Sequence, residues 1–317
     1  MIVAAAFIGG LVLLYIGGEA LVRGASAIGV KLGMSPMVVG LTIVAFATSA
    51  PELAVAIGAA LRDAPGLAVG NVVGSNICNL TLIVGIVVLL SRPSLRDKLI
   101  QFELLVLITA TILVTILLID AAVTRLEGVV LLAGIVTYIG VAVWRLQSDN
   151  KTSLEDLESS VPILSGSIST QALFCAAGVG ALILGSDWLV DACVAIATAL
   201  GIAPAVVGLT AAAFGTSLPE IAASIVAARH RHPDLAAGNL IGSNIFNLLV
   251  VLGGTSLVRP LVTGFVTGYD IAIMCAATFV SLGLMYFRAR LNRLDGAFLV
   301  AIYFAYIAFA FSPSTAP

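Results

Sequence analysis

One segment of this chain occurs twice. Residues 33–85 and 201–253 align without a gap, and more than half of the aligned positions are identical. The offset between the copies is constant at 168 residues, which is the separation of Glu52 and Glu220. Internal similarity of this kind indicates a structure built from repeated units. We therefore expect the two halves of the chain to share one local structure.

The composition places both copies in a membrane. Hydrophobic residues make up 60% of the 317 positions and charged residues only 10%, whereas a soluble globular protein carries about 25% charged residues. The apolar stretches are far longer than the ~10 alternating residues of an outer-membrane strand, so they predict helices. Soluble globular, disordered, fibrous and nucleic-acid-binding proteins are excluded, and the expected surroundings are lipid.

Charged or Pro/Gly-marked connections separate the apolar stretches and predict ten transmembrane helices. These lie near residues 2–30, 36–61, 67–90, 99–120, 125–145, 170–199, 204–229, 235–257, 268–287 and 295–312. A polar stretch rich in Ser and acidic residues divides the chain into a first five-helix repeat (1–145), a linker (146–169) and a second five-helix repeat (170–317). The predicted fold class is an all-α integral membrane protein.

The odd number of helices in each repeat predicts an inverted arrangement. After five crossings the second copy enters the membrane upside down, so a pseudo-two-fold axis in the membrane plane relates the copies. Lys and Arg concentrate after odd-numbered helices, and cytoplasmic loops are enriched in these residues. We expect a multi-pass protein of the cell (plasma or inner) membrane, with both termini outside and the linker in the cytoplasm.

Each repeat interrupts one helix with a Pro-Glu pair, Pro51–Glu52 in the first and Pro219–Glu220 in the second. Proline has no N–H for the carbonyl four residues back, Ala47 or Gly215, and its ring opens that turn. Irregular backbone survives in hydrocarbon only where protein, water or an ion satisfies it. Interrupted helices at the repeat interface are typical of the ion sites of secondary transporters.

Oxygen donors accompany both glutamates. They are hydroxyl and amide side chains of the interrupted helix and of the helix that follows it, namely Thr48, Ser49, Ser75, Asn79, Thr216, Ser217, Ser243 and Asn247. With no sulfur or imidazole in either motif, this donor set suits a hard cation such as Ca²⁺, which takes 6–8 oxygens. No basic residue lies within either motif. The expected partner of the two carboxylates is a cation that comes and goes, with protons holding the pair neutral in its absence.

The doubled Thr-Ser-x-Pro-Glu and Gly-Asn-x-x-Gly-Ser-Asn-Ile-x-Asn segments resemble the repeats of the calcium/cation antiporter superfamily, in its prokaryotic sodium/calcium exchanger branch. The resemblance covers the whole chain. It implies Ca²⁺/Na⁺ exchange by alternating access, in which the first helix of each repeat slides across a rigid core. It implies Glu52 and Glu220 as the main Ca²⁺ ligands, helped by the carbonyls of Thr48 and Thr216. It further implies flanking sodium sites at Ala45, Ser49, Ser75, Ala213, Ser217 and Ser243.

Asn79 and Asn247 depart from the exchanger pattern, because sodium/calcium exchangers that resemble this chain often carry Asp at one of these positions. The site then holds two formal negative charges, which match one Ca²⁺ and fall one short of three Na⁺. The counter-ion and the stoichiometry therefore stay open, and exchange of Ca²⁺ or another cation for H⁺ is the alternative. Interhelical hydrogen bonding is the structural alternative for both amides.

Other functional classes have weaker support. An intramembrane hydrolase would use the Gly-Ser-Asn serines, but it needs a base beside the serine, and His230 and His232 fall in a connection. A channel usually builds its selectivity ring from several subunits, whereas this chain supplies both halves of a site. We expect no enzymatic activity, no cofactor and no obligate protein partner, with a monomer sufficing and inorganic cations as cargo. Glu19 and its repeat equivalent Asp187 are candidates for gating or for the ion path.

Overall fold

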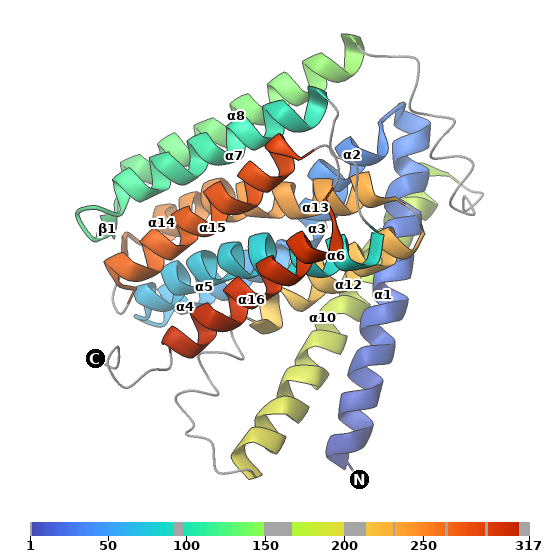
Figure 1. Cartoon of the computed structure of the whole chain (residues 1–317), viewed down its shortest axis with the longest axis horizontal. Coiled ribbons are helices and arrows are strands. Elements are labelled where there is room, and N and C mark those ends of the chain that lie inside the picture. The colour runs from blue at the N-terminus through green and yellow to red at the C-terminus, as the bar shows by residue number, and fades with distance from the viewer. Residues whose placement is uncertain are drawn as a thin grey trace.

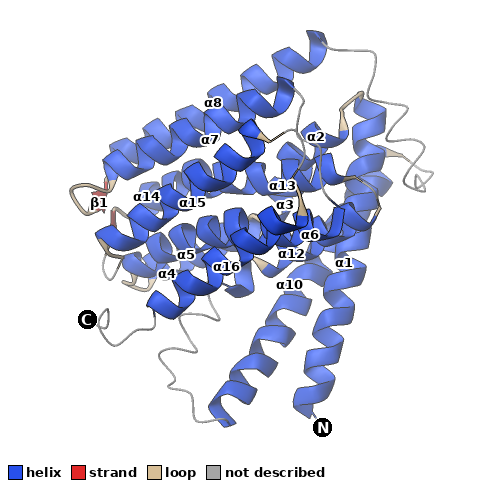
Figure 2. Cartoon of the chain, in the orientation of Figure 1, coloured by secondary structure: helices blue, strands red, loops and turns tan. Residues whose placement is uncertain are grey.

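The computed structural model describes residues 2–91, 98–148, 167–199, 214–230, 232–263, 266–288 and 291–310. Helices dominate these residues, and one two-stranded pair lies at an edge of the bundle (Figures 1 and 2). Eight helical segments are long and apolar enough to cross a membrane, and Gln101–Leu117 forms a shorter apolar helix. The protein is thus an all-α membrane protein, as the sequence predicts.

The first repeat consists of one continuous span, two spans that are divided into shorter helical segments, and two further helices. In chain order its elements are α1 (Ile2–Leu32), α2 (Pro36–Val39), η1 (Gly40–Val44), α3 (Ala45–Thr48), α4 (Ala50–Leu61), α5 (Pro65–Cys78), η2 (Asn79–Ile83), α6 (Val84–Ser91), α7 (Lys98–Leu117), β1 (Ala122–Val123) and α8 (Arg125–Ser148). The segments labelled η are π-helical turns, which insert one extra residue into a helix and are frequent at functional sites.

The second repeat follows the same plan. Its elements are α10 (Ile168–Ala199), α12 (Leu218–Arg229), α13 (Pro233–Phe246), η3 (Asn247–Val251), α14 (Leu252–Val258), β2 (Leu261–Val262), α15 (Gly268–Phe287) and α16 (Arg293–Ala310). The start of the predicted helix 204–229 and most of the linker lie outside the described residues. The bounds of α12, α13 and η3 equal those of α4, α5 and η2 shifted by the repeat offset.

Helices α1 and α10 lie side by side and extend beyond the rest of the bundle (Figure 1). A Cβ atom on Gly10 would lie 2.8 Å from the carbonyl oxygen of Gly185, and one on Gly17 would lie 2.8 Å from that of Gly178. Gly17 and Gly185 are repeat equivalents, as are Gly10 and Gly178. The two helices therefore run antiparallel and contact each other reciprocally, which is the pattern that a two-fold axis generates. Glycine permits this close backbone approach.

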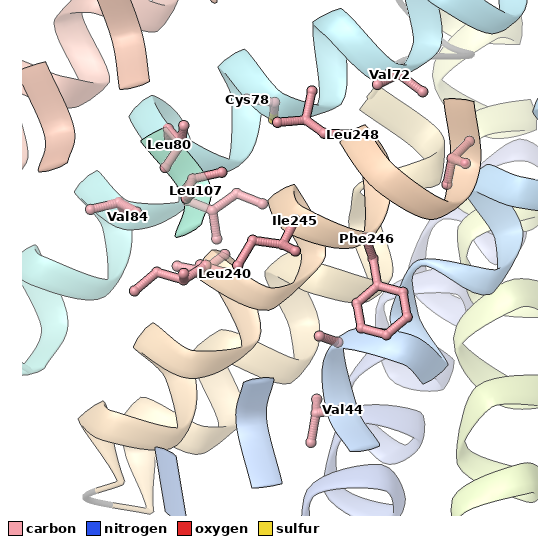
Figure 3. Close-up of a cluster of buried hydrophobic side chains, with 14 of the residues drawn as sticks. Val44, Val72, Cys78, Leu80, Val84, Leu107, Leu240, Ile245, Phe246 and Leu248 are labelled. Atoms are coloured by element: carbon pink, nitrogen blue, oxygen red, sulfur yellow. The ribbon is translucent and has the colours of Figure 1, made fainter. Parts of the chain in front are cut away.

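The core gathers around α5 and α13, which are the most deeply buried spans. Figure 3 shows Leu240 and Ile245 of α13 beside Leu107 of α7 and Leu80 of η2, and all four side chains are fully buried or nearly so. Large apolar side chains such as Ile116 and Phe298 are exposed on the outer helices, as expected of surfaces that face lipid. The inner helices thus form a rigid frame for the polar residues at the helix interruptions.

Candidate cation site

The two helix interruptions have nearly the same geometry. Ser49, between α3 and α4, has φ −83° and ψ 0°, and Ser217, before α12, has φ −86° and ψ −3°. Each is followed by a helix whose first turn carries a proline and, directly after the proline, Glu52 or Glu220. A carboxylate is stabilised near a helix N-terminus by the unpaired N–H groups and the helix dipole. The local sequence therefore places each acid at the break itself.

Both glutamates are completely buried. The Ser49 hydroxyl, from the first repeat, donates to Glu220 Oε1 of the second repeat at 3.4 Å. Ser49 and Glu52 belong to the same helix break, so this bond brings Glu220 to the break that carries Glu52. A residue of one helix break is therefore in contact with the acid of the other break.

Hydrogen bonds between the repeats are reciprocal. The Thr48 hydroxyl donates to Asn239 Oδ1 at 3.3 Å, and the Thr216 hydroxyl donates to Asn71 Oδ1 at 3.1 Å. Asn239 and Asn71 are repeat equivalents, as are the two threonines. Each interrupted helix is therefore fastened to the third span of the opposite repeat. The Thr48 hydroxyl also lies 3.4 Å from the Ser243 hydroxyl, which brings a further predicted residue to the site.

Several buried polar atoms around the glutamates have no hydrogen-bond partner among the described residues. They are both carboxyl oxygens of Glu52, Oε2 of Glu220, the Ser75 hydroxyl, and the amide oxygen and nitrogen of both Asn79 and Asn247. Buried polar atoms are normally paired, and an unpaired one costs about 1–3 kcal/mol. A bound cation would satisfy the oxygens among these atoms. The chemistry of the donor set thus fits a hard metal ion.

The remaining predicted ligands are placed as follows. Ala45 is fully buried in the first turn of α3, and Ser217 is fully buried at its helix break. Ala213 lies outside the described residues. No group of three or more His, Cys, Asp or Glu side chains that could hold a metal occurs in the described part of the chain. A cation site here must therefore combine the two carboxylates with neutral oxygens.

Sequence reasoning missed two features of the site. Asn79 and Asn247 each begin a π-helical turn, and a π turn leaves no signature in the hydrophobic pattern. The carbonyl of Gly215, which Pro219 leaves without a helical donor, accepts from the Ser186 hydroxyl of α10 at 2.5 Å. The repeat equivalent of Ser186 is Gly18, so this contact has no counterpart in the first repeat. Repeat comparison could have flagged this difference between Gly18 and Ser186.

Known proteins resemble the chain over almost its full length. Residues 2–145 and 170–312 match the model of a family described as "Sodium/calcium exchanger protein". The chain belongs to the sodium/calcium exchanger family. The exchanger is 37% identical to the putative antiporter CaxA of Alkalimonas amylolytica, over 98% of this chain and 100% of that protein. It is 31% identical to the sodium/calcium exchanger MaX1 of Methanosarcina acetivorans, over 95% of this chain and 96% of that protein.

Solved structures give the same assignment for the fold of the exchanger. The sodium–calcium exchanger NCX_Mj soaked with Na⁺ and Sr²⁺ matches it with a TM-score of 0.82 and 29% identity, over 97% of this chain and 98% of that one. NCX_Mj soaked with Na⁺ and without Ca²⁺ matches it with a TM-score of 0.81. The expected family and fold class are therefore confirmed.

Proposed function

We propose that this exchanger moves Ca²⁺ in one direction across the membrane and Na⁺ in the other, by alternating access to a single site between the repeats. The observation that carries the proposal is the pair of fully buried glutamates at repeat-related helix breaks, with unpaired oxygens around them. An intramembrane carboxylate is costly and marks an ion pathway. Two such carboxylates balance one Ca²⁺, so a bound divalent ion removes the electrostatic cost of the empty pair.

Glu52 and Glu220 act in this proposal as the charged Ca²⁺ ligands, and the carbonyls of Thr48 and Thr216 complete the centre. Ala45, Ser49 and Ser75 contribute to one flanking sodium position, and Ser217, Ser243 and Ala213 to the other. The amides of Asn79 and Asn247 line the site. Support comes from the burial of these residues within the described chain and from the hydrogen bonds that join the repeats around them.

The proposed orientation in the cell membrane has both termini outside and the linker in the cytoplasm, with repeats 1–145 and 170–317 inverted relative to each other. Three connections assigned to the outer side meet one another, which supports placing all three on the same side of the membrane. The strands β1 and β2 pair, Arg125 reaches the carbonyl of Val258, and Arg259 forms an ion pair with Asp63. The antiparallel contact of α1 with α10 supports the inversion.

The deciding experiment is isotope flux in proteoliposomes. Vesicles loaded with Na⁺ should accumulate ⁴⁵Ca²⁺ when external Na⁺ is removed, while K⁺ or H⁺ gradients imposed one at a time should not drive equal uptake. The double variant Glu52→Gln/Glu220→Gln should be inactive. Asp120→Asn, an exposed acid in the turn after α7, is the matched control and should keep full activity. Uptake driven by H⁺ but not by Na⁺ would replace Na⁺ as the counter-ion, and uptake that survives the double variant would refute the site.

A further inference from the structure

The two repeats differ in how the first helix of one packs against the interrupted helix of the other. Helix α1 packs along α12, but α10, the repeat equivalent of α1, makes little contact with α4, the equivalent of α12. A Cβ atom on Gly18 of α1 would lie 3.1 Å from Val226 Cγ2 of α12. The repeat equivalent of Val226 is Gly58 of α4. A Cβ atom on Gly58 would meet no atom within 4 Å. The contact between α1 and α12 is therefore tight, whereas the equivalent position on α4 is open.

A polar cluster joins the helices at the closed position. Glu19 Oε1 of α1 lies 2.9 Å from His230 Nε2, directly after α12, and Glu19 Oε2 accepts from Arg23 Nε at 2.8 Å. The Tyr15 hydroxyl donates to Glu19 at 3.2 Å. The Glu19 and His230 side chains are only 17% and 22% exposed. The sequence places His230 in a connection between helices. In the structure, His230 joins the end of α12 to α1.

The repeat equivalents of these residues are charged and apart. Glu19 corresponds to Asp187, His230 to Arg62 and Arg23 to Asp191. Asp187 and Arg62 are both exposed, and neither forms an ion pair with any residue that the structure describes. Asp187 instead has Asp191 one turn away on the same helix, α10, where like charges repel each other. An acid on the first helix and a base at the end of the interrupted helix therefore occur in both repeats, but only one set is in contact.

Two inverted repeats can exchange their conformations. The second access state of such a transporter is then the first state with the roles of the repeats swapped, by rigid movement of one bundle against the other. Applied to this chain, the swap packs α10 on α4 and separates α1 from α12. It brings Asp187 to Arg62 and removes Glu19 from His230. The swap also relieves the repulsion between Asp187 and Asp191, because the guanidinium neutralises one carboxylate.

We propose that Glu19–His230 and Asp187–Arg62 are alternative polar contacts, each of which holds the exchanger closed on one side of the membrane. This inference rests on the proposed alternating access. In the orientation given above, Glu19–His230 closes the cytoplasmic side and Asp187–Arg62 closes the outer side. The four residues are positioning residues, since they act on access and are not ion ligands.

Reversible cross-linking tests the proposal directly. Cys78, Cys175, Cys193 and Cys275 are free thiols, so they are first replaced by Ala and exchange is confirmed. One variant then carries Glu19→Cys with His230→Cys, and the other carries Asp187→Cys with Arg62→Cys. A short bifunctional methanethiosulfonate reagent links the two cysteines where they are close. A protease site in the linker then allows the chain to be cut, and a cross-link is detected because the two halves stay together. Arg62→Cys with His230→Cys reuses the same substitutions as a mismatched control, because these two residues lie in different halves of the chain and are repeat equivalents assigned to opposite sides of the membrane.

Both matched pairs should cross-link under exchanging conditions, and the control pair should not. Each cross-link should abolish Ca²⁺ uptake, and reduction should restore it. Cross-linking of Glu19→Cys/His230→Cys without any cross-linking of Asp187→Cys/Arg62→Cys, in vesicles that exchange Ca²⁺, would overturn the inference alone. Absence of exchange in the unmodified protein would instead overturn the proposed function.

A second measurement needs no cysteine replacement. In hydrogen–deuterium exchange of the full chain, His230→Gln should increase exchange in residues 222–230 and decrease it in 54–62. Arg62→Gln should produce the opposite pattern, because it removes the contact of the other state. The same direction of change in both variants would show that the residues only stabilise the fold, and would contradict alternative contacts.

Discussion

The centre and the outer ends of the two repeats differ in how strictly they obey the internal symmetry. At the centre, Thr48–Asn239 is mirrored by Thr216–Asn71, with lengths of 3.3 and 3.1 Å. At the ends, Glu19 contacts His230 while Asp187 and Arg62 are apart. In the proposed mechanism, this symmetric core is common to both access states, whereas the packing of α1 and α10 distinguishes them.

The largest expected effect breaks the symmetric centre. Glu52→Gln and Glu220→Gln, made singly, should each reduce Ca²⁺ uptake by roughly a hundredfold or more, because loss of one charged ligand costs about 3 kcal/mol. Initial rates of ⁴⁵Ca²⁺ uptake in proteoliposomes measure this. Glu127→Gln, a partly exposed acid in the first turn of α8, is the control. A large loss in only one variant would mean that the glutamates do not share one ion.

A smaller effect is expected where hydrogen bonds fasten the repeats together. Thr48→Val and Thr216→Val each leave a buried asparagine oxygen without its donor, which costs about 1–3 kcal/mol. Both variants should lower the midpoint of thermal unfolding in detergent by similar amounts. A fluorescence-based thermal shift assay provides the measurement, with Thr137→Val as the exposed control. Unequal shifts would show that the two reciprocal bonds do not carry equal weight.

Adding charge at the amides sharpens the comparison between the repeats. Asn247→Asp and Asn79→Asp each bring a third carboxylate to the site, which attracts a further monovalent cation. Inhibition of Ca²⁺ uptake by external Na⁺ should then become steeper, and uptake should respond more strongly to an imposed membrane potential. Titration of Na⁺ at fixed Ca²⁺ measures the steepness. An unchanged steepness in both variants would place the amides away from the transported ions.

The smallest effect is expected at an ion pair outside the moving contacts. Arg259 and Asp63 pair at the surface with side chains 45% and 75% exposed, and exposed pairs contribute about 0–1 kcal/mol. Arg259→Gln should leave Ca²⁺ uptake unchanged, whereas His230→Gln should change it a few-fold by favouring the other access state. Parallel uptake assays compare the two. Equal effects would remove the distinction between the moving contact and the static one.

Much of the fold and the centre of the site could be predicted from the sequence. Spans such as 36–61 and 268–287 agree with the helical bounds that the structure describes, because stretches of apolar residues and proline positions determine helices in a bilayer. The Pro-Glu pairs identify the breaks, since proline removes a backbone donor wherever it occurs. Because the segment is duplicated, the local structure predicted around Glu52 is also predicted around Glu220.

Only the tertiary structure decided which residues of one repeat meet which residues of the other. The pairing of Thr48 with Asn239 and the contact of Glu19 with His230 both join helices far apart in the chain. Contacts of this kind form between side chains far apart in the sequence, so no local pattern of residues predicts them. The sequence therefore determines the duplicated helix breaks, and three-dimensional packing decides that α1 lies against α12 while α10 makes little contact with α4.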